Sequence, residues 1–238
     1  MSEWKAKRFW KEARIAEQAN GYGVMLDSRP VRTPAKAELV VPSRALAEKI
    51  AREWDAQEGE IKPQAMPVTR AVNAAIDKVS VQHAEVADLL ADYGDSDLLC
   101  YRADAPDGLV ARQTEAWDPM LDWAERTLGA RLVPVRGVIY QPQDPAALST
   151  LRRQVHDMDV FTLTAFHDLV GLSGSLILGF AALSGQHDIR HLWALSRIDE
   201  TWQEEQWGKD DEATAMAAAK QSGFLSAKRF HELAQQTD

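Results

Sequence analysis

The chain has 238 residues, of which 45% are hydrophobic and 26% are charged, a balance typical of a folded globular protein. Its net charge of −9 repels phosphate backbones and anionic lipid, which argues against a nucleic-acid partner. The single cysteine, Cys100, excludes an internal disulfide framework and a cysteine-rich metal site. The most apolar stretch, residues 169–183, is too short to span a bilayer and predicts a buried helix without membrane insertion.

Residues 12–41 have the pattern of short strands joined by tight turns. Apolar and polar residues alternate in 13–17, Asn20 and Gly21 form a turn pair, and the apolar pattern resumes in 22–26. Two further short strands are expected at 31–33 and 38–41, bounded by Pro34 and Pro42. This pattern predicts a small antiparallel sheet built from local hairpins.

From Ser43 onward the apolar residues recur at helical spacing. Ser43 is a candidate N-cap, and Leu46, Ile50 and Trp54 share one face of the helix that follows. Further helices are expected at 68–79, 81–93, 108–128, 145–157, 160–183, 188–207, 210–221 and 224–235, with one strand at 137–140. Gly129 is a natural stop for the 108–128 helix, and Pro119 should kink or divide it.

These elements predict an α+β protein with a small N-terminal antiparallel β domain followed by a larger, mainly α-helical domain. We place the β-rich domain, which includes the first helix, at residues 1–60 and the helical domain at 61–238. The N-terminus lacks the apolar segment of a signal peptide, so we expect a cytoplasmic protein.

The chain lacks the common motifs of cofactor and nucleophile sites. It has no Walker A sequence and no G-x-S-x-G elbow, and Gly21-Tyr22-Gly23 lacks the third glycine of a dinucleotide fingerprint. We therefore expect no cofactor, no small-molecule substrate and no enzymatic activity.

His187 and His191 offer the one alternative. They are four residues apart on a predicted helix, a spacing that can seat a metal ion and would suit a metal-dependent hydrolase. However, the glutamate of an H-E-x-x-H motif and a third ligand are both missing. The simpler interpretation is that His187 and Asp188 begin a helix, that His191 packs, and that there is no metal site.

The 188–207 helix is the most informative segment. Besides its core face it has a second stripe in which Trp193, Glu200 and Trp207 are spaced two turns apart. A central core helix explains this stripe as well as a partner-binding surface does. In the second case the carboxylate would anchor a partner's Arg, Lys or backbone N–H, and the indoles would supply contact area.

Trp123 raises the same question on the 108–128 helix. It lies about 120° from the apolar face of that helix, counted at the usual rotation per residue. An exposed tryptophan would indicate a second contact surface, whereas burial under a neighbouring element is the alternative.

Three segments resemble the family of assembly chaperones that bind the alpha subunit of the F1 ATP synthase. They are DLLCYR at 97–102, GLVARQ with the following EAWDP and DWAE at 108–125, and LSRIDE with the following WQ and WG at 195–208. Shorter matches extend to Lys7, so the resemblance covers most of the chain. Asp199 stands where glutamate is more usual.

The resemblance implies the same α+β fold and a chaperone that holds the free alpha subunit before the F1 hexamer assembles. It implies that Glu200 is the functional acid, and we add Asp199, Trp193, Trp207 and Trp123 as partner-binding candidates. Eukaryotic members of the family are matrix proteins, and the missing targeting segment indicates a bacterial one. A permanent subunit of a stable complex is the other non-enzymatic reading.

Overall fold

The computed structural model describes residues 7–137 and 139–237, whose contacts divide them into two compact units. The first unit comprises the chain up to Gln82, Val160–Ala165 and the residues from Arg229 onward, and the second comprises His83–Asp159 and Phe166–Lys228. These units are defined by contacts, whereas the predicted boundary at residue 60 separates independently folding domains. That boundary stays a prediction. Within the described residues, no helix combines the length and the hydropathy needed to cross a bilayer.

The first unit contains an antiparallel sheet in which β2 (Gly21–Leu26) is the central strand. It pairs with β1 (Ala13–Gln18), β3 (Arg29–Pro30) and β4 (Val40–Val41). Gly21 is required at the turn, because a Cβ there would lie 2.3 Å from the Val41 carbonyl oxygen. The sheet confirms the predicted N-terminal β structure, and with the helices that follow it confirms the α+β class.

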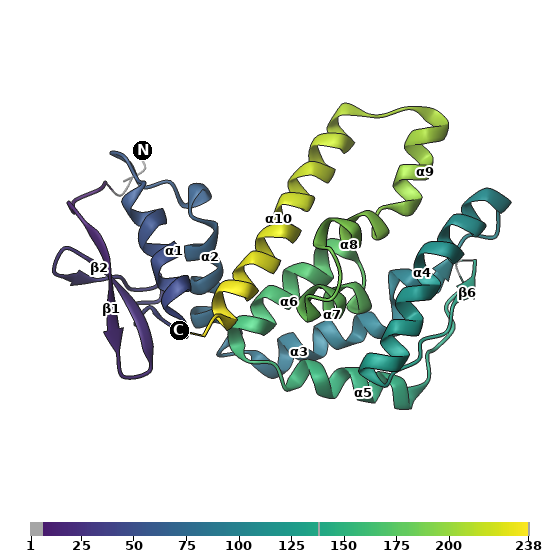
Figure 1. The fold of residues 1–238 in the computed structure, drawn as a ribbon, viewed down its shortest axis with the longest axis horizontal. Coiled ribbons are helices and arrows are strands. Elements are labelled where there is room, and N and C mark those ends of the chain that lie inside the picture. The colour runs from purple at the N-terminus through teal and green to yellow at the C-terminus, as the bar shows by residue number, and fades with distance from the viewer. Residues whose placement is uncertain (1–6, 138, 238) are drawn as a thin grey trace. The chain divides into compact units, whose positions relative to one another are not determined.

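Helices α1 (Arg44–Asp55) and α2 (Pro67–Ala74) lie on one side of this sheet (Figure 1). Ser43 caps α1 as predicted, since its side-chain oxygen accepts the Leu46 N–H at 3.1 Å. The buried Glu53 carboxylate in turn accepts the N–H groups of Val68 and Thr69 at the start of α2. A short 3₁₀ turn (Pro63–Ala65) precedes α2, and a π turn (Ala75–Val79) follows it.

The second unit is built mainly from helices. They are α3 (His83–Ala91), α4 (Asp107–Leu128), α5 (Pro145–His156), α7 (Leu176–Ser184), α8 (Ile189–Leu195) and α9 (Ile198–Trp207). Two 3₁₀ turns (Asp92–Ser96 and Leu98–Cys100) lead into β5 (Tyr101–Arg102), which pairs in parallel with β6 (Val135–Arg136). Helices α6 (Val160–Ser173) and α10 (Asp211–Gln235) contribute residues to both units.

Helix α4 confirms the predicted helix at 108–128 and its stop at Gly129, which has a φ of +68°. The helix is continuous across Pro119, so the expected division there is absent. The strand expected at 137–140 includes residue 138, which lies outside the described residues, and the strand that the structure shows lies earlier, at Val135–Arg136. It ends at Gly137, whose φ of +78° leaves the extended conformation although its N–H still donates to the Arg102 carbonyl.

Two helices that the sequence predicted as continuous are broken. The predicted 160–183 helix ends at Gly174, which has a φ of +73°, and Ser175 then caps α7. The buried Asp97 carboxylate holds this break, because it accepts both the Ser175 hydroxyl and the Ile177 N–H. The predicted 188–207 helix divides into α8 and α9, where the Ser196 hydroxyl donates to the Trp193 carbonyl and Arg197 leaves the helical conformation.

The opposite error concerns α10, which the sequence predicted as two helices on either side of Gly223. The helix continues through this glycine, and the reason is packing. A Cβ at Gly223 would lie only 3.0 Å from a methyl group of Leu172, so the glycine lets α10 approach α6 closely.

Candidate partner-binding site

The structure buries two of the five candidate residues. Trp193 on α8 is 6% exposed and its ring packs against Phe224, with the ring centroids 5.7 Å apart. Trp123 on α4 is 7% exposed, its indole N–H donates to Gln186, and its ring meets His187 edge to face. The structure thus decides the alternative left open for both rings: each is buried against neighbouring residues, and neither forms an exposed contact surface. For Trp193 the reason is the break after α8, which removes it from the helix that carries Glu200 and Trp207.

Helix α9 positions the remaining three candidates. Trp207, its last residue, is 80% exposed, the highest fraction among the large hydrophobic side chains described. Glu200 lies in the first turn, partly exposed, and accepts a hydrogen bond from Arg197 at 2.6 Å. Asp199 beside it accepts the Gln113 amide at 2.6 Å. One indole and two carboxylates thus lie on a single ten-residue helix.

A charged and aromatic contact fixes α9 against α4. Arg112 donates to both carboxylate oxygens of Glu205, at 3.0 and 2.8 Å, and its guanidinium lies over the Trp202 ring, 4.8 Å from the centroid. The hydrogen bonds from Arg112 lower the pKa of the Glu205 carboxyl. Gly108 gives Trp202 room, because a Cβ there would lie 2.8 Å from the ring.

Sequence reasoning missed this contact between α4 and α9. Trp202 and Glu205 are three residues apart and therefore share one face of a helix, which was an available signal. Nothing in the sequence, however, identified Arg112 as their partner on another helix.

A buried layer of polar contacts on α4 lies beneath this contact. Gln113, 1% exposed, accepts the Ala103 N–H while its amide group donates to Asp199. Trp117 is fully buried, and its indole N–H donates to the Leu195 carbonyl at 2.8 Å, at the end of α8. Arg102 stacks on the Trp117 ring and donates to Asp118. The acidic side chains of α9 therefore lie above a buried layer in which Gln113, Trp117 and Arg102 all have hydrogen-bond partners.

The surface made by α9, the loop after it and the first turn of α10 is acidic. The surface carries the indole of Trp207, the positive charge of Lys209 and seven carboxylates. The carboxylates are those of Asp199, Glu200, Glu204, Glu205, Asp210, Asp211 and Glu212. Exposed aromatic area next to carboxylates suits recognition of a protein surface that carries Lys, Arg or free backbone N–H groups.

The two histidines of the alternative hypothesis have separate structural roles. Asp188 is the N-cap of α8 and accepts the backbone N–H of His191 at 2.8 Å, which confirms the predicted helix start. The His191 side chain is exposed, so the expectation that it packs is wrong. His187 packs its ring against Trp123. No group of three or more His, Cys, Asp or Glu residues within 7–137 and 139–237 is placed to hold a metal ion.

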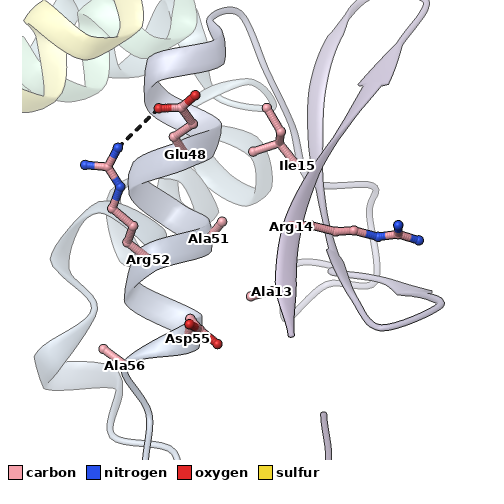
Figure 2. A pocket seen from close by; sticks show the side chains of 8 residues that line it. All are labelled: Ala13, Arg14, Ile15, Glu48, Ala51, Arg52, Asp55 and Ala56. Carbon is pink, nitrogen blue, oxygen red and sulfur yellow. Dashed lines mark hydrogen bonds and ion pairs between the residues drawn. The ribbon is translucent and has the colours of Figure 1, made fainter. Parts of the chain in front are cut away.

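A groove of about 560 Å³ lies between β1 and α1 in the first unit (Figure 2). Ile15 and Ala51 contribute apolar surface to it, and Arg52 pairs with Glu48 at 3.2 Å along its wall. Its lining contains no His, Cys, Ser or Thr, and the charges that line it are of both signs. Both carboxylates that line the groove are already paired, Glu48 with Arg52 and Asp55 with Arg8 at 3.0 Å.

Comparison with known proteins identifies the family of the chain. The family model described as ATP12 chaperone protein matches residues 7–125. The protein atp12, mitochondrial, of Schizosaccharomyces pombe is 28% identical over 220 residues, which cover 87% of this chain and 75% of the yeast protein.

Solved structures are similar over nearly the whole chain. The crystal structure of Atp12 from Paracoccus denitrificans has a TM-score of 0.95 and 51% identity, covering 98% of this chain and all of the other. A mutant of the same Paracoccus protein, named Atp12p, gives the same TM-score, identity and coverage. The family model spans half of the chain, and the Paracoccus relative matches it throughout. The chain therefore belongs to the ATP12 chaperone family.

Proposed function

We propose that this chaperone of ATP synthase assembly binds the free F1 alpha subunit and keeps it from aggregating until the F1 hexamer forms. It does so without catalysis, in the cytoplasm of a bacterium. The observation that carries the proposal is Trp207, which is 80% exposed at the end of the acidic helix α9. Tryptophan is enriched where protein surfaces meet, so an exposed indole beside carboxylates suits a contact surface.

The physical need for such a chaperone follows from the F1 ring. Alpha and beta subunits alternate in it, so each free subunit exposes an interface that is normally covered. Apolar area of that size promotes aggregation, and a protein that covers it stabilises the monomer by mass action. Because the chaperone must later be displaced, polar contacts such as those of Glu200 and Asp199 suit it better than a wholly apolar interface.

Within the proposed site the five candidate residues have different parts. Trp207, Glu200 and Asp199 are accessible from solvent on α9 and contact the client directly. Trp123 and Trp193 support the site indirectly. Each is buried, and Trp123 holds α4 in place while Trp193 holds α8. Replacing either buried ring should lower stability before it changes affinity.

The test measures soluble complex between the purified protein and isolated alpha subunit by gel filtration. The wild type should form a complex, and Glu200→Lys should lose most of it. Glu125→Lys on α4 is the matched control. Its carboxylate is 45% exposed and paired with Arg131 at 2.6 Å, against 46% and the same distance for Glu200 with Arg197.

Three outcomes would count against parts of the proposed function. Absence of a wild-type complex would refute direct alpha-subunit binding. Equal binding by Glu200→Lys and wild type would remove Glu200 from the site and leave the function standing. Co-purification with mature F1 at fixed stoichiometry would identify a permanent subunit instead of a transient chaperone.

A further inference from the structure

The first half of α10 is a helix with very little packing. Among residues 211–220, Ala217 alone is half-buried, and every other residue is exposed. Met216 in the middle of this segment is 56% exposed. Figure 1 shows this part of α10 and α9 extending together from the helices of the second unit. We call residues 207–220 the α9–α10 tip.

The face of α10 that is buried in its second half extends along the helix into the exposed first half. Further along the helix, Phe224 and Ala227 are buried, and Phe224 packs against Trp193. At the usual rotation per residue, Met216 lies about 20° from Ala227, roughly three turns earlier on the helix. The side of α10 that packs in its second half is therefore uncovered in its first half, where it carries an exposed methionine.

Local interactions explain why the unpacked half remains helical. The Asp210 side chain caps the helix by accepting the Ala213 N–H at 2.7 Å. Asp211 and Glu212 lie in the first turn, where negative charge is favourable, and the alanines that follow have the highest helix propensity. The segment is thus preformed, which lowers the entropic cost of binding.

From these observations we infer that the first half of α10 inserts into an apolar groove of the client whose rim is rich in Lys and Arg. The mode is that of a helix in a groove, with Met216 as the central apolar contact. The basic rim follows from charge complementarity to the three acids at the start of the helix, Asp210, Asp211 and Glu212, which outnumber the neighbouring Lys209, while Lys220 lies at the far end of the segment. This inference rests on the proposed function, since it takes the F1 alpha subunit as the client.

The experiment compares two matched variants in a binding titration with purified F1 alpha subunit. Met216→Gln removes the apolar contact but keeps helix propensity, and Leu89→Gln on α3 does the same at a site that is 57% exposed. We expect Met216→Gln to raise Kd about tenfold and Leu89→Gln to leave it within about twofold, the contrast between a central contact and a non-contact position. The helix should also show slower amide hydrogen exchange at 214–220 in the complex.

The outcomes separate this inference from the proposed function. Wild-type binding with equal Kd values for Met216→Gln and Leu89→Gln overturns the inference and leaves the alpha-subunit proposal intact. Absence of wild-type binding overturns both. If the wild type is instead a dimer that Met216→Gln converts to a monomer, the tip binds a second copy of the chain and the inference is wrong.

Discussion

The hydrogen bond between Gln113 and Asp199 provides a sharp test of how α4 supports α9. Gln113 accepts the Ala103 N–H at 2.8 Å, and this fixes its amide orientation so that the NH₂ group faces Asp199 at 2.6 Å. Changing Gln113 to Glu keeps the acceptor for Ala103 but places a second carboxylate against Asp199. The variant should therefore be destabilised although its shape is almost unchanged.

The magnitude follows from two contributions. Loss of a hydrogen bond to a charged group costs about 1.5–3 kcal/mol. Repulsion between the two carboxylates adds between about 1 and 4 kcal/mol, nearer the lower value because Asp199 is partly exposed. We expect Gln113→Glu to lower the free energy of unfolding by roughly 3–5 kcal/mol, on the sum of these two terms.

A second substitution should reverse most of this loss. In the double variant Gln113→Glu with Asp199→Asn, the donor and acceptor simply exchange places, so the hydrogen bond forms again. Asp199→Asn alone keeps a neutral hydrogen bond and should cost only about 1 kcal/mol. The coupling energy between the two substitutions should therefore be favourable by about 3 kcal/mol, within the range for contacting residues.

The assay is urea unfolding followed by tryptophan fluorescence, with the free energy obtained from the midpoint and slope. Gln203→Glu, an exposed change of the same kind on α9, is the control and should have an effect of less than about 0.5 kcal/mol. The reasoning is refuted if Gln113→Glu is as stable as the wild type, or if Asp199→Asn fails to rescue it.

Three further predictions concern the core of the second unit. Burial raises the pKa of the Asp97 carboxyl from 3.8 to about 6, so the folded state binds this proton more tightly than the unfolded state. The free energy of unfolding should fall by about 2 kcal/mol as pH rises from 4 to 7, and Asp97→Asn should show a smaller fall in urea titrations at the two pH values. Burial also raises the pKa of the Cys100 thiol, so a thiol-specific reagent should label Cys100 only after urea unfolding, and rapid labelling at pH 8 would contradict the structure. Gly179→Leu should destabilise the protein by about 2–3 kcal/mol in thermal unfolding, because a Cβ there lies 2.7 Å from Val170; an unchanged Tm would show that α6 and α7 can separate freely.

Much of the fold was predictable because its causes are local. Ser43 caps α1 through a residue three positions away, and Gly129 ends α4 through its own backbone conformation. Alternating apolar and polar residues in β1, followed by the turn pair Asn20 and Gly21, likewise identified a hairpin. These features depend on a few consecutive residues, so sequence pattern alone sufficed for the α+β class.

The helix breaks show where pattern analysis failed. Gly174 followed by Ser175 is a stop and a cap in succession, a signal that the apolar character of 169–183 concealed. The break between α8 and α9 has a weaker signal, because Ser196 and Arg197 both occur inside helices. Periodicity counted across that break placed Trp193 beside Glu200, and the resulting surface was incorrect for Trp193.

The sequence by itself determined the class of fold, the caps of several helices and the acidic, tryptophan-rich character of the segment that ends at Trp207. Only the tertiary structure decided which tryptophans reach solvent and which partner each acid has. Gln113 and Asp199 are 86 positions apart, and their hydrogen bond exists because α4 and α9 pack together. Burial and long-range pairing depend on how helices are arranged in space, and short-range periodicity does not encode that arrangement.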